Sequence, residues 1–252
     1  MAVPQIMDTS FPPAMRTFGR MDDLDLDFAG ADRPALVTAL LTHCAGGDAD
    51  YWWSQPVGAR AAALLDLLAF NERIDALELS ANCTNAECGA AFGFELPLHE
   101  LAAQAPHRET WSVPLSGGRH LTLRSPVGRD LQRWRAVQPP TREQAMRMML
   151  EDLAGDGRPE PDDIEAIGDA LIQLDPLVAL DVAAECPACG HTQDVAVDVE
   201  GLVLLHFGRR QRAMMHDVHR LASCYGWTEP QVLAIPAARR AVYLALLDRE
   251  AG

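Results

Sequence analysis

The sequence contains few basic residues and no long apolar run. Its 252 residues include 21 lysine and arginine residues against 36 aspartate and glutamate residues, which gives a formal net charge of −15. Because contacts to phosphate need a basic surface, this balance argues against nucleic-acid binding and favours docking on other proteins. No apolar run reaches the roughly 18 residues that span a bilayer, and the first residues lack the features of a signal peptide. We therefore expect a cytoplasmic protein with no membrane partner, in which thiols stay reduced.

Sequence motifs of common enzyme families are absent as well. There is no GxSxG, no Walker loop and no GxGxxG between a strand and a helix. The histidines of His216-Asp-Val-His219 lack the glutamate-bearing HExxH spacing of a metalloprotease, and a pair at i and i+3 is usually an exposed helix face. Cys44 and Cys224 fall on expected helical faces without an evident activating base. We therefore expect a protein that is not an enzyme.

The other four cysteines form two pairs, each followed by glycine and each placed between two β-like runs. These runs cover residues 77–81 and 92–96 around the first pair, and residues 178–182 and 195–199 around the second. A glycine permits a turn with positive φ, which lets backbone amides point at thiolate sulfurs. Tetrahedral zinc needs four such ligands, and each pair supplies two. The spacing predicts one structural zinc ion held by Cys83, Cys88, Cys186 and Cys189.

Other uses of these cysteines remain open from the sequence alone. Two disulfides, four unrelated buried thiols or a redox-active pair are the alternatives, and His191 is a possible substitute ligand. The second pair, CPxCG, is the stronger signal, because the first has four intervening residues. A redox CxxC opens a helix after a strand, whereas Gly190-His191-Thr192 leads into another strand. Zinc is therefore the favoured interpretation.

A zinc ion in this position would join segments that lie roughly a hundred residues apart. Structural zinc in small fingers contributes about 10–16 kcal/mol in apparent binding. The net stability of a whole domain is only about 5–15 kcal/mol. We therefore expect removal of the metal to abolish cooperative unfolding of the core.

The hydrophobic pattern predicts an α+β protein, mostly helical, with a split zinc-ribbon-like pair of β-hairpin knuckles and an inserted β-hairpin. Residues 1–31 are expected to form an arm or edge strand. Residues 32–107 hold helices and the first knuckle, residues 108–175 the inserted hairpin and further helices, and residues 176–252 the second knuckle and a helical segment. Helices are predicted at 32–46, 56–71, 129–137, 141–153, 162–175, 201–225, 228–233 and 236–247, with a short amphipathic stretch at 98–103 and a loop at 155–161.

One further signal is a resemblance to a known family. It is carried by the CPxCG knuckle and by four later runs: Asp217-Val-His219-Arg-Leu221-Ala222, Tyr225-Gly226-Trp227-Thr228-Glu229, Val232-Leu233-Ala234 and Arg239-Arg240-Ala-Val-Tyr243-Leu244. Residues 175–247 resemble the T-even-type phage baseplate-hub and hub-assembly proteins, which have relatives in extracellular contractile injection systems. The first two thirds fit that family only in the order of elements. The resemblance implies a non-enzymatic assembly factor or hub adaptor, with baseplate hub and spike proteins as partners.

The C-terminal helices offer a candidate docking surface. Mixtures of aromatic residues and arginine are enriched where partners anchor. The residues concerned are Tyr225, Trp227, Tyr243, Arg239 and Arg240. The alternative for the aromatic residues is simple packing of the helical hairpin, and Asp248 and Glu250 are near enough to compete for the arginines.

Two other functions follow from different uses of the same metal. A zinc-ribbon regulatory protein that binds nucleic acid or another protein would need a basic face for nucleic acid, which the composition does not favour. A zinc hydrolase would need an open coordination position, and four thiolates leave none.

Overall fold

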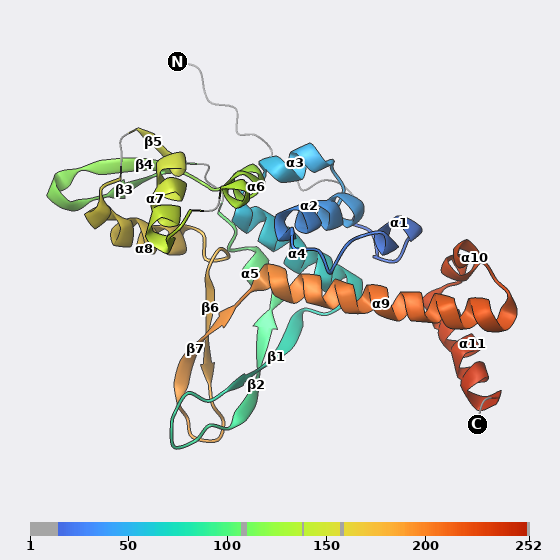
Figure 1. Cartoon of the computed structure of the whole chain (residues 1–252). Coiled ribbons are helices and arrows are strands. Elements are labelled where there is room, and N and C mark those ends of the chain that lie inside the picture. Colours follow the sequence, from blue (N-terminus) through green and yellow to red (C-terminus); the bar gives the residue numbers. More distant parts are fainter. Residues whose placement is uncertain (1–14, 107–109, 138, 157–158, 251–252) are drawn as a thin grey trace, which may run out of the picture.

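The computed structural model describes residues 15–106, 110–137, 139–156 and 159–250. Over these residues the protein is α+β, as the sequence predicted. Helices form an elongated body, and three small antiparallel sheets are attached to it (Figure 1). No helix in the described ranges is both long enough and apolar enough to cross a membrane.

Three helices make the body: α2 (Arg33–Cys44), α4 (Val57–Glu72) and the first half of α9 (Val199–Tyr225). Helix α4 is the central one, because every alanine and leucine between residues 61 and 68 is buried. It ends at Arg73, which adopts a left-handed conformation with φ 57°. The shorter helices α3 (Ala49–Ser54) and α5 (Leu98–Ala102) complete this body. The main apolar core therefore combines residues from both ends of the sequence.

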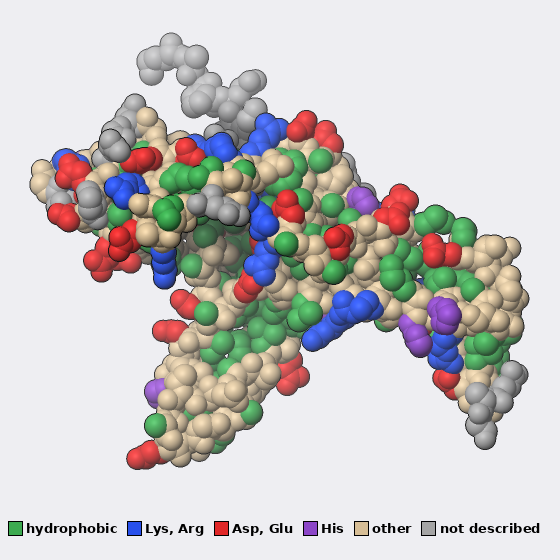
Figure 2. Space-filling view, viewed as in Figure 1, with side chains coloured by type: hydrophobic (Ala, Val, Ile, Leu, Met, Phe, Trp, Pro, Cys, Tyr) green, Lys and Arg blue, Asp and Glu red, His purple; other side chains and the backbone are tan. Residues whose placement is uncertain are grey.

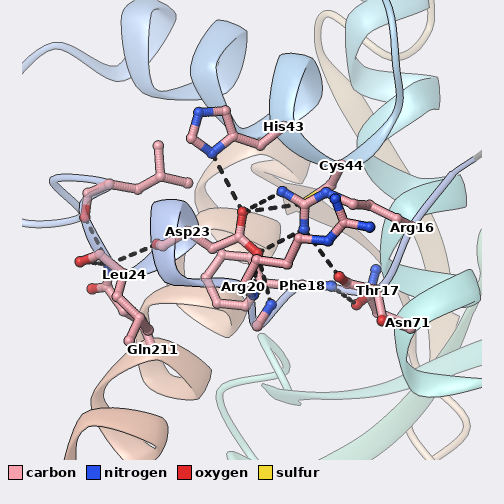
Figure 3. A network of polar contacts seen from close by, with 12 residues as sticks. Arg16, Thr17, Phe18, Arg20, Asp23, Leu24, His43, Cys44, Asn71 and Gln211 are labelled. Carbon is pink, nitrogen blue, oxygen red and sulfur yellow. Dashed lines mark hydrogen bonds and ion pairs between the residues drawn. The ribbon is translucent and has the colours of Figure 1, made fainter. Parts of the chain in front are cut away.

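The N-terminal segment differs from the expected arm or edge strand. Residues 15–28 contain the short helix α1 (Met21–Leu24) and no strand, and Phe18 is buried in the main core. Asp23 is completely buried and anchors the segment through the polar network in Figure 3. The rest of the expected arm, residues 1–14, lies outside the described residues.

Two β-hairpins project together from one end of the body (Figure 1). The first pairs β1 (Ala76–Asn82) with β2 (Ala91–Pro97), and the second pairs β6 (Leu180–Glu185) with β7 (Thr192–Val197). The first hairpin confirms the predicted strands. The second lies nearer its cysteines than predicted, since the Asp198 side chain accepts a hydrogen bond from the Gly201 amide and thereby begins α9.

The inserted segment forms a lobe with an apolar cluster of its own. Its predicted hairpin is confirmed as β3 (Thr110–Pro114) and β4 (His120–Arg124), which are linked by a short 3-10 turn, Ser116–Gly118. The expected loop is wrong at its start, where β5 (Ala154–Asp156) adds a third strand beside β4. The remaining elements of the lobe are α6 (Gly128–Ala136), α7 (Arg142–Leu153), the 3-10 turn Pro161–Asp163 and α8 (Ile164–Leu174).

The C-terminal part of α9 leaves the body and carries two further helices, α10 (Glu229–Ala234) and α11 (Ala237–Glu250). These helices pack against the end of α9 around buried Val218, Leu221 and Val232. We call this unit, residues 218–250, the arm; from here on the word refers to this C-terminal unit and not to the N-terminal segment 1–31. Figure 1 shows α11 and the two hairpins projecting below α9, at opposite ends of that helix, while α10 lies above it.

Candidate metal centre

Each cysteine pair lies in the turn of one projecting hairpin. In the first turn the Cys83 amide donates to the Ala90 carbonyl at 2.9 Å, and the Gly89 amide donates to the Asn85 carbonyl at 3.1 Å. Gly89 adopts φ 58°, a conformation that side-chain-bearing residues rarely take. The turn therefore closes tightly behind Cys88.

The second turn is built in the same way. The Cys186 amide donates to the His191 carbonyl at 2.9 Å, and the Gly190 amide donates to the Cys186 carbonyl at 2.8 Å. Gly190 adopts φ 71°. Both glycines thus occupy the positive-φ positions that the sequence pattern predicted for them.

The two turns bring all four sulfurs to one point. The Sγ atoms of Cys83 and Cys189 lie 3.6 Å apart and those of Cys88 and Cys186 lie 3.9 Å apart. All four lie within 4.8 Å of one another. A tetrahedral zinc site with Zn–S bonds of about 2.3 Å has S–S separations of about 3.8 Å. A disulfide bond is about 2.05 Å long, and all four cysteines are free thiols. This arrangement matches a metal site and excludes two disulfides in this state.

The electrostatic environment differs between the sulfurs. Burial raises the pKa of the Cys83 thiol to about 12, and the neighbouring thiols add to this effect despite the nearby Asn85 amide. The His191 amide lowers the pKa of Cys189 to about 7. Cys186 is fully buried, whereas Cys189 is exposed. A bound divalent cation would offset the cost of holding negative sulfurs together here, because metal ligation deprotonates thiols.

Polar side chains next to the sulfurs connect the two hairpins. The Gln193 Oε1 atom accepts hydrogen bonds from the Thr84 amide at 2.7 Å and from its hydroxyl at 3.1 Å. The Gln193 Nε2 atom donates to the Asn82 carbonyl at 3.0 Å. His191 lies 3.2 Å from the Thr84 hydroxyl, so its ring serves this link rather than replacing a cysteine. These hydrogen bonds were not predicted, because no sequence pattern relates residue 84 to residue 193.

Apolar contacts close the inner side of the cluster. Phe92 of β2 and Ala184 of β6 are buried with Cys83 and Cys186 in a small cluster separate from the main core. Alternation along the strands places these side chains between the hairpins and leaves the polar ones outside. The site therefore has a dry inner side and an exposed edge at Cys189.

The remaining sequence candidates lie far from this centre in the fold. His216 and His219 are both exposed on α9, and the described residues contain no second cluster of three or more potential metal ligands. Cys44 is buried beside Asp23, and Cys224 is exposed near the end of α9. None of these residues joins the four-cysteine site.

The predicted docking residues divide into two groups. The rings of Tyr225, Trp227 and Tyr243 contact one another, with centroid separations of 4.6 Å, 5.2 Å and 5.9 Å, so they form the outer part of the arm's own packing. Arg239 is exposed. The sequence placed both arginines on the docking surface, but Arg240 points into the arm. It is only 9% exposed and donates hydrogen bonds to the carbonyls of Leu233 and Ile235.

Comparisons with known proteins give no relative for this chain. No model of a known protein family, no curated protein and no solved structure matches it. The metal centre and the arm therefore have to be interpreted from their own residues.

Proposed function

We propose that this chain is a non-enzymatic zinc-binding protein in which one structural zinc ion locks the two projecting hairpins together. The observation that carries the proposal is the convergence of four cysteine sulfurs within 4.8 Å of one another. Four thiolates complete the tetrahedral shell of zinc and leave no position for water or substrate, which is the arrangement of a structural site. Closed thiolate sites favour zinc over the harder cations that prefer oxygen ligands.

The role proposed for this scaffold is that of an assembly factor or hub adaptor in the baseplate of a contractile tail or contractile injection system. Support comes from the resemblance over residues 175–247. The projecting arm and hairpins also suit a protein that holds partners (Figure 1). Baseplate hub and spike proteins are the proposed partners, with Arg239 and the aromatic group of Tyr225, Trp227 and Tyr243 as the proposed contacts.

A nucleic-acid-binding regulator fits the surface less well. The two hairpin segments, residues 76–97 and 178–198, contain seven aspartate and glutamate residues and no lysine or arginine. Phosphate groups would be repelled by that surface. A mobility shift with duplex DNA that weakens as salt increases would favour the regulator over the adaptor.

Two measurements test the proposal at its two levels. Elemental analysis of purified protein should find one zinc per chain, and zinc should be lost from a Cys186→Ser, Cys189→Ser variant. A Cys44→Ser, Cys224→Ser variant is the matched control, because neither cysteine belongs to the site. Co-expression with the products of neighbouring genes should then recover a hub or spike protein. Zinc below half an equivalent would refute the metal centre, and loss of every baseplate partner would refute only the adaptor role.

A further inference from the structure

The outward face of the first hairpin carries an unfavourable pair of charges. Glu78 of β1 stands directly opposite Glu95 of β2, and both side chains are exposed. Like charges directly opposite each other on neighbouring strands destabilise a sheet. Neither carboxylate has an ion pair among the described residues. The fold therefore maintains a repulsion here that an external cation would relieve.

The same face is flat beyond these two glutamates. Ser80 is paired with Gly93 and Asn82 with Ala91, so only small side chains follow along the hairpin. Gly93 has no positive φ, and the nearest atom to a Cβ built there is the Glu78 Oε1, at 3.1 Å. Nothing in the backbone of the chain requires glycine at this position. Glycine inside a strand often marks the close approach of another backbone.

A complementary surface lies on the outer side of α11. Arg239, Val242, Leu246 and Arg249 follow one another at intervals of three or four residues, so they form one stripe, and all four are exposed. Val242 is 57% exposed, which is the largest value among the large hydrophobic residues described. No described residue forms an ion pair with Arg239 or Arg249. The side chain of Arg249 donates a hydrogen bond to the Ala245 carbonyl of its own helix. The stripe thus presents two arginines around an apolar centre.

The two surfaces also agree in length. From residue 239 to residue 249 the helix rises about 15 Å, and from residue 78 to residue 82 a strand extends about 13 Å. They cannot meet within one molecule, because α9 separates them and its 27 residues span about 40 Å. Figure 1 shows that both project from the same side of α9, and the visible face of the hairpins in Figure 2 carries acidic side chains and no basic ones.

We propose that the chain associates with a second copy of itself, with the α11 stripe of one molecule lying on the outward β1–β2 face of the other. The Arg239 guanidinium is the cation that neutralises Glu78 and Glu95, and Val242 and Leu246 cover the small side chains beside Gly93. When the arm of each molecule contacts the β1–β2 hairpin of the other, the two molecules form a closed dimer with two identical contacts. The inference does not depend on the baseplate role.

Charge-reversed variants test this contact in the full-length, zinc-loaded protein. Sedimentation equilibrium should show a mass that rises with concentration, more strongly at about 50 mM than at about 500 mM salt, because salt screens exposed ion pairs. A hairpin variant, Glu78→Arg with Glu95→Arg, should be monomeric. An arm variant, Arg239→Glu with Arg249→Glu, should be monomeric as well. The control is Glu165→Arg with Asp169→Arg, two exposed positions on α8, which should associate like the wild type.

Mixing the two monomeric variants gives the decisive result. Each variant retains one intact surface, so an equimolar mixture should form a one-to-one dimer, and a chain that carries all four substitutions should regain self-association. Recovery in the mixture also shows that both variants are folded. A wild type that stays monomeric at every concentration and salt would overturn the proposal. Dimers of either variant as stable as the wild type, or a mixture that stays monomeric, would overturn it equally.

Discussion

The sulfurs of Cys83 and Cys189 lie 3.6 Å apart, although the two residues are 106 positions apart in the sequence. The segment between them contains β2, helix α5 and the whole inserted lobe. A link between such distant residues restricts the unfolded chain strongly, because the entropy of loop closure grows with loop length. The apolar contacts around the sulfurs are few. A metal bound by the four sulfurs would therefore support the hairpin tips directly.

Metal removal should consequently loosen the hairpins without melting the body. The sequence led us to expect loss of cooperative unfolding in the whole core, but the main core contains none of the four clustered cysteines. A chelated, zinc-free sample should retain its helical circular dichroism and a cooperative thermal transition. Hydrogen exchange should accelerate at the tips, in residues 79–94 and 183–194, while residues 61–68 of α4 stay protected.

Two outcomes would contradict this expectation. Unchanged protection of the hairpin tips in a demonstrably zinc-free sample would show that the apolar cluster and the Thr84–Gln193 bonds are sufficient by themselves. Simultaneous loss of protection in α4 and the hairpins would restore the expectation drawn from the sequence. The Cys44→Ser, Cys224→Ser variant should respond to chelation like the wild type.

A second prediction concerns Asp23, the buried centre of the network in Figure 3. Arg16 donates two hydrogen bonds to its carboxylate, at 2.6 and 2.7 Å, and the amides of Gly19 and Arg20 donate two more. Burial alone would raise the pKa of Asp23, but these donors lower it below its usual value. Replacing one member of a buried ion pair costs about 3–5 kcal/mol. Asp23→Asn should therefore lower the free energy of unfolding by about 3 kcal/mol near neutral pH.

The pH dependence identifies the cause. Because the folded pKa of Asp23 is depressed, its stabilisation is present above the unfolded pKa and is lost as pH falls through the folded pKa. The difference between wild type and Asp23→Asn in urea unfolding should therefore shrink in acid. Asp22→Asn, at an exposed neighbour, is the matched control and should change little. A constant difference at every pH would point to altered packing instead of charge.

Asp175 should behave in the opposite way. It is buried between α8 and β6, where its Oδ2 atom accepts a hydrogen bond from the Gly58 amide at 3.1 Å. Its Oδ1 atom has no hydrogen-bond partner among the described residues. Burial raises the pKa of Asp175 to about 6. The folded protein therefore binds a proton that the unfolded chain releases between about pH 4 and pH 6.

This raised pKa makes the ionised form a source of instability. As pH rises from about 3 to about 7, the folded state should lose about 3 kcal/mol relative to the unfolded state through this group alone. Asp175→Asn keeps an acceptor for Gly58 and removes the titration, so its free energy of unfolding should exceed that of the wild type at pH 7 and approach it near pH 3. Asp169→Asn, on an exposed face of α8, serves as the control. Equal pH slopes for wild type and Asp175→Asn would refute the assignment.

The sequence identified the four cysteines that cluster because the CPxCG and CxxxxCG turns have a local pattern that only a few structures use. It also located most helices, since their apolar spacing is local. The docking of residues 15–28 onto the body was not predictable in this way, because it depends on Gln211 of α9, whose side chain donates to the carbonyls of Asp23, Leu24 and Leu26. Such long-range polar contacts leave no periodic trace in the sequence. Arg240 was misjudged for a different reason, since its partners are the nearby backbone carbonyls of Leu233 and Ile235, which a pattern of side chains does not reveal.

The last prediction separates Arg239 from Arg240 within the arm. Arg240 donates to the Ile235 carbonyl at 2.9 Å and approaches the Leu233 carbonyl at 3.4 Å, so it satisfies the free carbonyl groups at the end of α10. Removing a hydrogen-bonded charged donor from buried acceptors costs about 1–3 kcal/mol. Arg240→Ala should therefore destabilise the arm, which hydrogen exchange in α10 and α11 will reveal, while the body stays protected.

Arg239→Ala is the matched control at the neighbouring position, because Arg239 is exposed and has no ion pair among the described residues. It should leave the stability of the arm unchanged and weaken only the contacts proposed for this surface, with a second copy of the chain and with a baseplate partner. Both hydrogen bonds come from the single Nη1 nitrogen of Arg240, so Arg240→Lys, whose ammonium can also donate to two carbonyls, should restore part of the stability. Equal destabilisation by the Arg239 and Arg240 substitutions would show that both side chains support the arm, and would remove Arg239 from the proposed contact.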